Sequence, residues 1–277
     1  MPTATNLAYE GSAGTVSLDG PLLYVGTALG IRGRKWTYTL GRRNISSQVR
    51  QATEASLSAK FLSLQAADDA RTVFDTDVAA GTPGKLVSGE WSQRAYVVAS
   101  SPSTRYHEYV STSLTVLLLD GSWSRTETTH FYPSQNVSDY GKQYTYGYPY
   151  DYAPYSSART AVIPGTEPNP FRLVIYGRAV SPSITIAGNL YQFDISVPSG
   201  GYLLVDTSDD PVVQLVTADG IVSDAFDSAN RGSGEGSGEY AFQPIPPGMQ
   251  LVSWDDSFGF DLTIYHQESE LPWTSSS

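Results

Sequence analysis

The sequence predicts a mainly β protein of two domains with a single α-helix. Only 16% of its 277 residues are charged, against about a quarter in an average soluble domain. Four lysines and ten glutamates are too few to cover the solvent-facing sides of many helices. The 25 glycines and 17 prolines favour short strands joined by turns. This composition excludes an all-helical protein and disfavours a many-helix α/β enzyme, and the length is close to that at which one core gives way to two.

The N-terminal region contains alternating runs that predict strands. Trp36, Tyr38 and Leu40 alternate with small polar residues, which is the period of a strand. Residues 49–64 have the same spacing. The apolar side of this second run consists of Ala55, Leu57, Ala59 and Phe61.

One helix is predicted, over about residues 65–79. Apolar residues at helical spacing share one of its faces: Ala70, Val73, Phe74 and Val78. Most of its charged residues are expected elsewhere on the helix: Asp68, Asp69, Arg71, Asp75 and Asp77. Gly81 and Pro83 end the helix, because neither residue continues it well.

Three further strands are predicted after the helix, over residues 91–100, 106–119 and 124–132. Ser101-Pro102 and Asp120-Gly121 are the expected turns between them. Asp-Gly between two β runs is a typical hairpin signal.

Residues 133–170 differ in composition and predict a linker or an extended arm. Seven tyrosines fall between Tyr140 and Tyr155, mixed with glycine, proline and serine, and neither helical nor strand periodicity is visible. Tyrosine side chains are amphipathic, so the segment either packs on another surface or forms a solvated or self-packed linker. Pro164, Pro168 and Pro170 stiffen its end.

The C-terminal region, residues 171–277, predicts a β-sandwich of short strands separated by glycine, proline and aspartate turns. The flexible loop 232–238 (GSGEGSG) lies among these strands. The expected strands are 172–176, 183–186, 191–197, 202–205, 212–217, 249–254 and 258–265.

The net charge of −11 lies almost entirely in the C-terminal region. Residues 1–132 carry a balance of +1, residues 133–170 carry −1, and residues 171–277 carry −11. Phosphate backbones repel such a surface, so we expect no nucleic-acid binding; an acidic face that aids solubility is the simpler interpretation. Cysteine is absent, and we expect no disulfide, no signal peptide and no membrane-spanning segment.

No catalytic, cofactor-binding or metal-binding residue is assigned from the sequence, and we expect no enzyme activity and no cofactor. His107, His130 and His266 are scattered and have no partner at metal-ligand spacing. No serine has the G-x-S-x-G context of a nucleophile. Residues 81–86 (GTPGKL) lack the glycine spacing and the Ser/Thr of a phosphate loop, and residues 206–217 lack the Gly and Glu of a calcium loop.

Several C-terminal segments contain short motifs whose order and spacing are informative. They lie in residues 169–196, 245–254 (IPPGMQLVSW) and 268–273 (ESELPW). The matching motifs are Asn169-Pro170, Ile175-Tyr176-Gly177, Pro182-Ser183-Ile184, Pro246-Pro247-Gly248, Trp254 and Pro272-Trp273. Together they resemble the C-terminal domain of the distal tail protein (Dit) family of long-tailed (siphovirus-type) bacteriophages.

The N-terminal half resembles the ring-forming domain of the same family. The similar segments, in order, are 38–45 (YTLGRRNI), Ala70-Arg71, 83–86 (PGKL), Trp91, 95–100 (AYVVAS) and 117–125 (LLLDGSWSR). No single motif is diagnostic, since these are turn and core residues. The resemblance covers the chain except for residues 133–170.

The resemblance implies a fold and a structural role. Residues 1–132 would form a split β-barrel-like domain with one α-helix that closes into a homohexameric ring. Residues 171–277 would form an acidic, galectin-like β-sandwich on the outside of the ring, with residues 133–170 as linker or arm. The ring would lie at the distal end of the virion tail, between the tail tube protein and the tail tip or receptor-binding proteins. Synthesis would take place in the cytoplasm of the host bacterium, without membrane attachment.

A carbohydrate-binding module at the tail tip, contacting the host cell wall, is the alternative function. Galectin-type binding needs a polar cluster beneath a tryptophan. The basic residues of the C-terminal region, Arg172, Arg178, Arg231 and His266, are spread over unrelated strands in the sequence. The sequence therefore favours the structural role.

Overall fold

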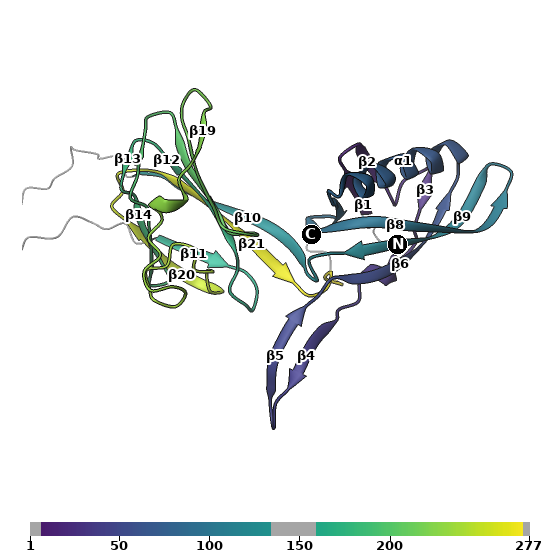
Figure 1. Cartoon of the computed structure of the whole chain (residues 1–277), viewed down its shortest axis with the longest axis horizontal. Helices are drawn as coiled ribbons and strands as arrows, with labels where there is room; N and C mark the ends of the chain where they lie inside the picture. Colours follow the sequence, from purple (N-terminus) through teal and green to yellow (C-terminus); the bar gives the residue numbers. More distant parts are fainter. Residues whose placement is uncertain (1–6, 134–158, 274–277) are drawn as a thin grey trace, which may run out of the picture. The chain divides into compact units, whose positions relative to one another are not determined.

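The computed structural model describes residues 7–133 and 159–273, which fold into two compact units. The first unit comprises the chain up to Arg125 and the segment from Gln267 onward, and the second unit is Thr126–His266. The chain passes between the units within two strands. These strands are β10 (Trp123–Phe131) and β21 (Phe260–Glu268) (Figure 1).

This division differs from the sequence boundary at residue 132 and from the expected single C-terminal region. Residues 126–132 belong to the second unit, where Phe131 stacks on Phe260 with ring centroids 4.6 Å apart. Residues 267–273 belong to the first unit, where Leu271 is buried in the core. Tertiary packing decides to which unit residues 126–132 and 267–273 belong, and the amino-acid composition does not reveal that packing.

The sequence boundary at residue 170 also shifts. Strand β11 (Arg159–Ile163) lies inside the stretch 133–170 that was expected to be a linker or arm, and it pairs with β20 (Gly248–Trp254) along its whole length. Ala161 and Ile163 are buried in the core of the second unit. Residues 134–158, which include all seven tyrosines of the arm hypothesis, lie outside the described residues.

The first unit is an antiparallel sheet with one helix, α1 (Leu64–Ala80), packed on it (Figure 1). The strands pair in the order β2-β1-β7-β8-β9-β6-β3. Their bounds are β1 Leu7–Gly11, β2 Gly14–Ser17, β3 Leu23–Tyr24, β6 Thr53–Phe61, β7 Gly84–Ser88, β8 Trp91–Tyr106 and β9 Tyr109–Leu118. The short 3-10 helix Leu29–Ile31 also belongs to this unit. The predicted apolar side of β6 is confirmed, because every second residue from Ala55 to Phe61 is buried.

Helix α1 confirms the predicted element to within a residue at each end, and Gly81 ends it in the left-handed conformation. Its buried face differs from the prediction at the last turn, where Asp77 is fully buried and Val78 is exposed. The Asp77 carboxylate accepts hydrogen bonds from the Tyr9 hydroxyl at 2.8 Å and from the Ser12 amide at 2.9 Å. Helical periodicity could not show that Asp77 has partners on the β1–β2 hairpin.

Strand β8 runs through Ser101-Pro102, where the sequence predicted a turn. The pairing of β8 with β9 shifts register between Pro102 and Thr104, and the actual turn follows at His107, whose φ is 43°. Beyond Ala95 the described strands pair with only one edge of β8. A proline is tolerated there because it lies beside a bulge, in a part of β8 that has a strand on one edge only.

Asp120-Gly121 forms the predicted turn, with Gly121 at a φ of 63°. The prediction that this turn joins β9 and β10 into a hairpin is wrong. Strand β10 pairs with β8, through Ser124 and Ser92, and not with β9.

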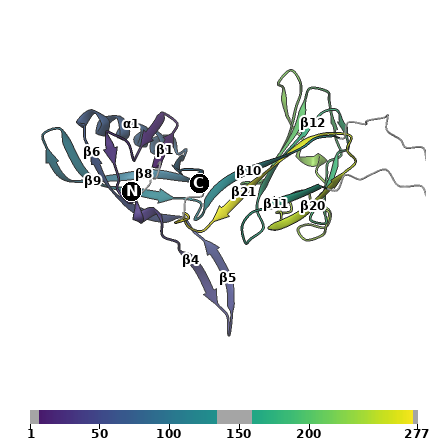
Figure 2. The same ribbon diagram turned by 180° about the vertical axis from the view of Figure 1, so that it is seen from behind.

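The second unit is a sandwich of two antiparallel sheets. One sheet has the order β11-β20-β14-β15, and the larger has the order β10-β21-β12-β17-β18-β19. Figure 2 labels β11 and β20 of the first sheet and β10, β21 and β12 of the larger one. The remaining strands are β4 Trp36–Leu40 and β5 Ile45–Arg50 of the first unit, and β12 Phe171–Tyr176, β13 Ala179–Val180, β14 Ser183–Ile186, β15 Asn189–Gln192, β16 Ser196–Val197, β17 Tyr202–Asp206, β18 Val212–Val216 and β19 Val222–Asp224 of the second. Six of the seven strands predicted for this region are confirmed. The strand predicted over residues 191–197 is wrong as one element, because the range holds the end of β15 and then β16, with residues 193–195 between them. The strands β11, β13 and β19 were not foreseen.

Two of the motifs named in the sequence contain a glycine that the structure requires, Gly248 and Gly177. Gly248, which follows Pro246-Pro247, has a φ of 98°, where a side chain would be strained. A Cβ on Gly177 would overlap the carbonyl oxygen of Pro198. Gly248 is therefore required by its backbone conformation, and Gly177 by the close approach of the Pro198 backbone.

Candidate assembly interface

The β4–β5 hairpin is the most exposed regular element of the first unit. The two strands pair with each other, from Trp36 opposite Arg50 to Leu40 opposite Ile45, and with no other described strand. The hairpin stands away from the sheet of its unit in both views (Figures 1 and 2). An isolated two-stranded hairpin is only marginally stable in water, so this one is expected to gain stability from a partner.

Apolar side chains on this hairpin, which we call the arm hairpin, face solvent. Tyr38 is 58% exposed and Leu40 is 71% exposed. Ile45 and Val49 are also more than half exposed. Only Trp36 is partly covered, by the Arg50 guanidinium 4.7 Å from its ring centroid. The alternating residues do form a strand, as predicted, but no core residue of the first unit lies on β4 or β5.

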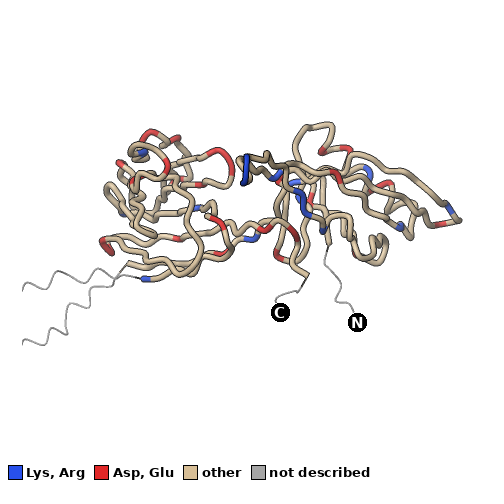
Figure 3. The backbone as a smooth tube through the Cα atoms, turned by 90° about the horizontal axis from the view of Figure 1, so that it is seen from below, with Lys and Arg blue, Asp and Glu red and all other residues tan. Residues whose placement is uncertain are grey.

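The arm hairpin and its approach are also purely basic. Residues 20–53 contain no aspartate or glutamate. They hold six of the twelve basic residues of the first unit, namely Arg32, Arg34, Lys35, Arg42, Arg43 and Arg50. In Figure 3 the acidic residues dominate the second unit, in contrast with this segment. A partner for the arm hairpin should therefore be acidic and should offer apolar contacts.

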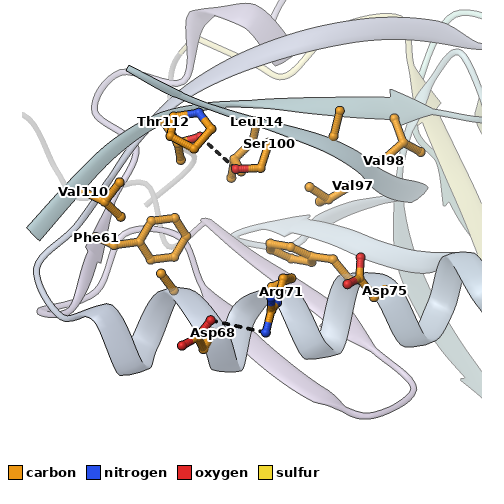
Figure 4. Close-up of a pocket in the computed structure, with 14 residues that line it drawn as sticks. Phe61, Asp68, Arg71, Asp75, Val97, Val98, Ser100, Val110, Thr112 and Leu114 are labelled. Atoms are coloured by element: carbon orange, nitrogen blue, oxygen red, sulfur yellow. Dashed lines mark hydrogen bonds and ion pairs between the residues drawn. The ribbon is translucent and has the colours of Figure 1, made fainter. Parts of the chain in front are cut away.

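A groove of about 310 Å³ lies between α1 and the strands β8 and β9 of the same unit (Figure 4). Its floor is apolar, since Phe61, Val97 and Leu114 point into it from the sheet. Phe74 closes it from the helix. The groove is thus an apolar hollow with a helix along one side.

The helical rim of the groove is acidic. Asp68, Asp69 and Asp75 are exposed on α1, and Asp68 and Asp75 line the groove. Arg71 is the only basic residue of the helix, and it forms an ion pair with Asp68 at 3.3 Å. The groove therefore has the charge and the apolar character that the arm hairpin requires of a partner. The exposure of the arm hairpin shows that it does not fill the groove of its own chain.

The residues that the sequence considered for catalysis or metal binding are not assembled into such a site. Among the described residues, no group of three or more histidine, aspartate or glutamate side chains could hold a metal ion. His107 lies at the turn after β8, and His266 is buried in the second unit. Residues 81–86 lead into strand β7 and so do not open a helix. His130 does have a carboxylate neighbour, Asp261, which the sequence could not show across 131 residues.

The fold resembles solved phage proteins over nearly the whole chain. The Dit protein of phage SPP1, described as a paradigm of the hub adsorption apparatus in phages that infect Gram-positive bacteria, aligns with a TM-score of 0.59 at 9% identity, covering 95% of this chain and 98% of that one. Chains of the phage P2 baseplate in its activated conformation align with TM-scores of 0.56. The chain from the structure with Ca is 12% identical, and the alignment covers 96% of this chain and 98% of that one. The chain from the structure with Sr is 11% identical, and the alignment covers 96% of this chain and 99% of that one.

These likenesses establish the fold. Over its described residues the chain is mainly β with one α-helix, and it has a Dit-like architecture, as the sequence motifs predicted. No protein-family model matches the sequence, and a comparison with curated proteins finds no significant match. Within residues 7–133 and 159–273, no helix is long and apolar enough to cross a membrane.

Proposed function

We propose that this chain is a structural protein of a bacteriophage tail, a hub that forms a homohexameric ring at the distal end of the tail tube. The observation that carries this proposal is the Dit-like fold over 95% of the chain, spanning both units. The solved relatives are described as a hub of a phage adsorption apparatus and as a phage baseplate. One side of the ring would meet the tail tube protein and the other the tip or receptor-binding proteins.

The ring would close by a head-to-tail contact in which the arm hairpin of one copy lies in the groove of the next. A contact between two different surfaces of the same chain generates a ring when its rotation closes. Arg42 and Arg43 at the hairpin tip would face Asp68 and Asp75 of the neighbouring α1. Leu40 would supply the apolar contact with the groove.

Charge supports the placement of the two units in such a ring. The first unit carries twelve basic and twelve acidic residues, so six copies of it can meet without net repulsion. The second unit carries the whole net charge of −11, from five basic and sixteen acidic residues. Repeated six times, that charge is best tolerated at the periphery, where salt and water screen it.

A charge swap tests the hairpin contact. The double variant R42E/R43E should lower the solution mass of the assembly, measured by light scattering on a sizing column, because like charges would then face each other. Adding Asp68→Lys and Asp75→Lys to the same chain should restore the mass. Lys85→Glu, an exposed reversal on β7 outside the groove, is the matched control and should leave the mass unchanged.

The contact would be refuted by two results. One is an R42E/R43E variant with the mass of the natural assembly. The other is a quadruple variant that stays dissociated while its circular dichroism and melting temperature match those of the natural chain.

A further inference from the structure

A second hollow, of about 250 Å³, lies within the second unit at the ends of three neighbouring strands of the larger sheet. β10, β12 and the start of β21 contribute to it. Its chemically active lining consists of Tyr132, Tyr176, Arg178, Ser257 and Asp261. We call it the tyrosine pocket.

The carboxylate of Asp261 is held in a fixed orientation at this pocket. Its Oδ1 lies 2.6 Å from His130 Nδ1, and its Oδ2 accepts a hydrogen bond from the Tyr176 hydroxyl at 2.7 Å. The Asp261 side chain remains 21% exposed, so it is oriented by the protein but open on one side. The hydrogen bond to Asp261 is also the largest cause that raises the pKa of Tyr176 from its ordinary value to about 12.

Two aromatic rings stand beside this carboxylate with much of their surface free. Tyr176 is 43% exposed and Tyr132 is 67% exposed. The ring of Tyr132 stacks against that of His130, with centroids 6.4 Å apart. Amphipathic rings next to a small number of oriented polar groups are typical of binding sites for ligands with both apolar and polar faces.

The charges of the pocket disfavour strongly ionic ligands of either sign. Asp261 and the net charge of −11 on the second unit oppose phosphates and other anions. The exposed Arg178 opposes cations. A neutral ligand that both donates and accepts hydrogen bonds satisfies the carboxylate, the phenols and the guanidinium together.

We propose that the tyrosine pocket binds a neutral saccharide, with one sugar ring in the hollow. Vicinal sugar hydroxyls would donate to Asp261 and accept from Arg178, while the C–H face of the ring would lie on Tyr132 or Tyr176. The volume is below the ~300–1,000 Å³ of sites for drug-sized ligands, which suits a single ring of a longer glycan. This inference does not depend on ring formation by the first unit.

The test is a glycan array probed with the fluorescently labelled full-length chain, followed by titration calorimetry with each bound saccharide. We expect binding to one or more neutral glycans. Asp261→Asn and Tyr132→Ala should each weaken the affinity about tenfold or more, through the loss of a charged acceptor and of a ring face. Tyr132 is exposed, so its variant should fold normally.

Asp206 supplies a matched control on the same sheet. Its carboxylate likewise accepts hydrogen bonds from a tyrosine hydroxyl, that of Tyr265 at 2.8 Å, and from Arg172 at 2.9 Å, but it does not line the pocket. Asp206→Asn should leave saccharide affinity unchanged. The proposal is overturned if no neutral glycan binds, if only anionic glycans bind, or if Asp206→Asn weakens binding as much as Asp261→Asn.

Discussion

Asp77 shows how one side chain links helix α1 to the first β hairpin. Burial alone would raise the pKa of its carboxyl, but hydrogen bonds from the side chain and the amide of Ser12 and from Tyr9 together lower the pKa below the ordinary value. A group with a lowered pKa in the folded state stabilises the protein above its unfolded-state pKa. That stabilisation is lost as the pH falls through the folded-state pKa.

Asp77→Asn should therefore destabilise the first unit by about 1–3 kcal/mol at neutral pH, the usual cost of disrupting a buried charged hydrogen bond. The difference in unfolding free energy between the natural chain and the variant should narrow as the pH drops below about 4. Urea unfolding of both proteins from pH 7 to pH 3 measures this. A difference that stays constant over the range would contradict the assignment of an ionised Asp77.

The saccharide prediction also belongs to the residue scale, because it depends on Asp261, Tyr132 and Tyr176. The sequence could not reveal this cluster. His130 and Asp261 are 131 residues apart, and only the pairing of β10 with β21 brings them together. The same limit explains Asp77, whose charge suggested a solvent-facing position although its partners lie 65 and 68 residues away.

At the scale of elements, we expect the arm hairpin to be needed for assembly but not for folding of the single chain. No buried core residue of the first unit lies between Trp36 and Arg50. Replacing residues 37–49 by a short Gly-Ser turn should therefore leave the melting temperature of the isolated chain within a few degrees of the natural one. The same replacement should abolish the multimer seen by light scattering. An unchanged mass would show that the hairpin has no part in assembly.

Strands and helix were predictable because their periodicity is local. The ends of α1 and the buried side of β6 follow from residue spacing alone. Periodicity predicted β4 as a strand but could not show whether its apolar side chains pack on the core, and they are exposed. Ser101-Pro102 predicted a turn because proline usually interrupts a strand. The sequence could not show that β8 continues through it, since that depends on the tertiary pairing of β8.

At the scale of the whole molecule, the uneven distribution of charge can be read from the sequence, and the order of turn and core motifs predicted the Dit-like fold. The boundaries between the two units could not be predicted from the sequence, because they fall inside the strands β10 and β21. A neutral first unit and a strongly acidic second unit support the proposed ring, in which the first units would pack together and the second units would lie at the solvated periphery. Ring formation is accordingly the central claim about this molecule.

The solution mass of the purified full-length chain tests that claim most directly. Light scattering on a sizing column should give about six times the 29.9 kDa of one chain, and negative-stain images of that peak should show a closed ring with a central channel. A mass of one chain at every concentration tested, or a two-fold symmetric dimer without a channel, would contradict a self-assembling ring.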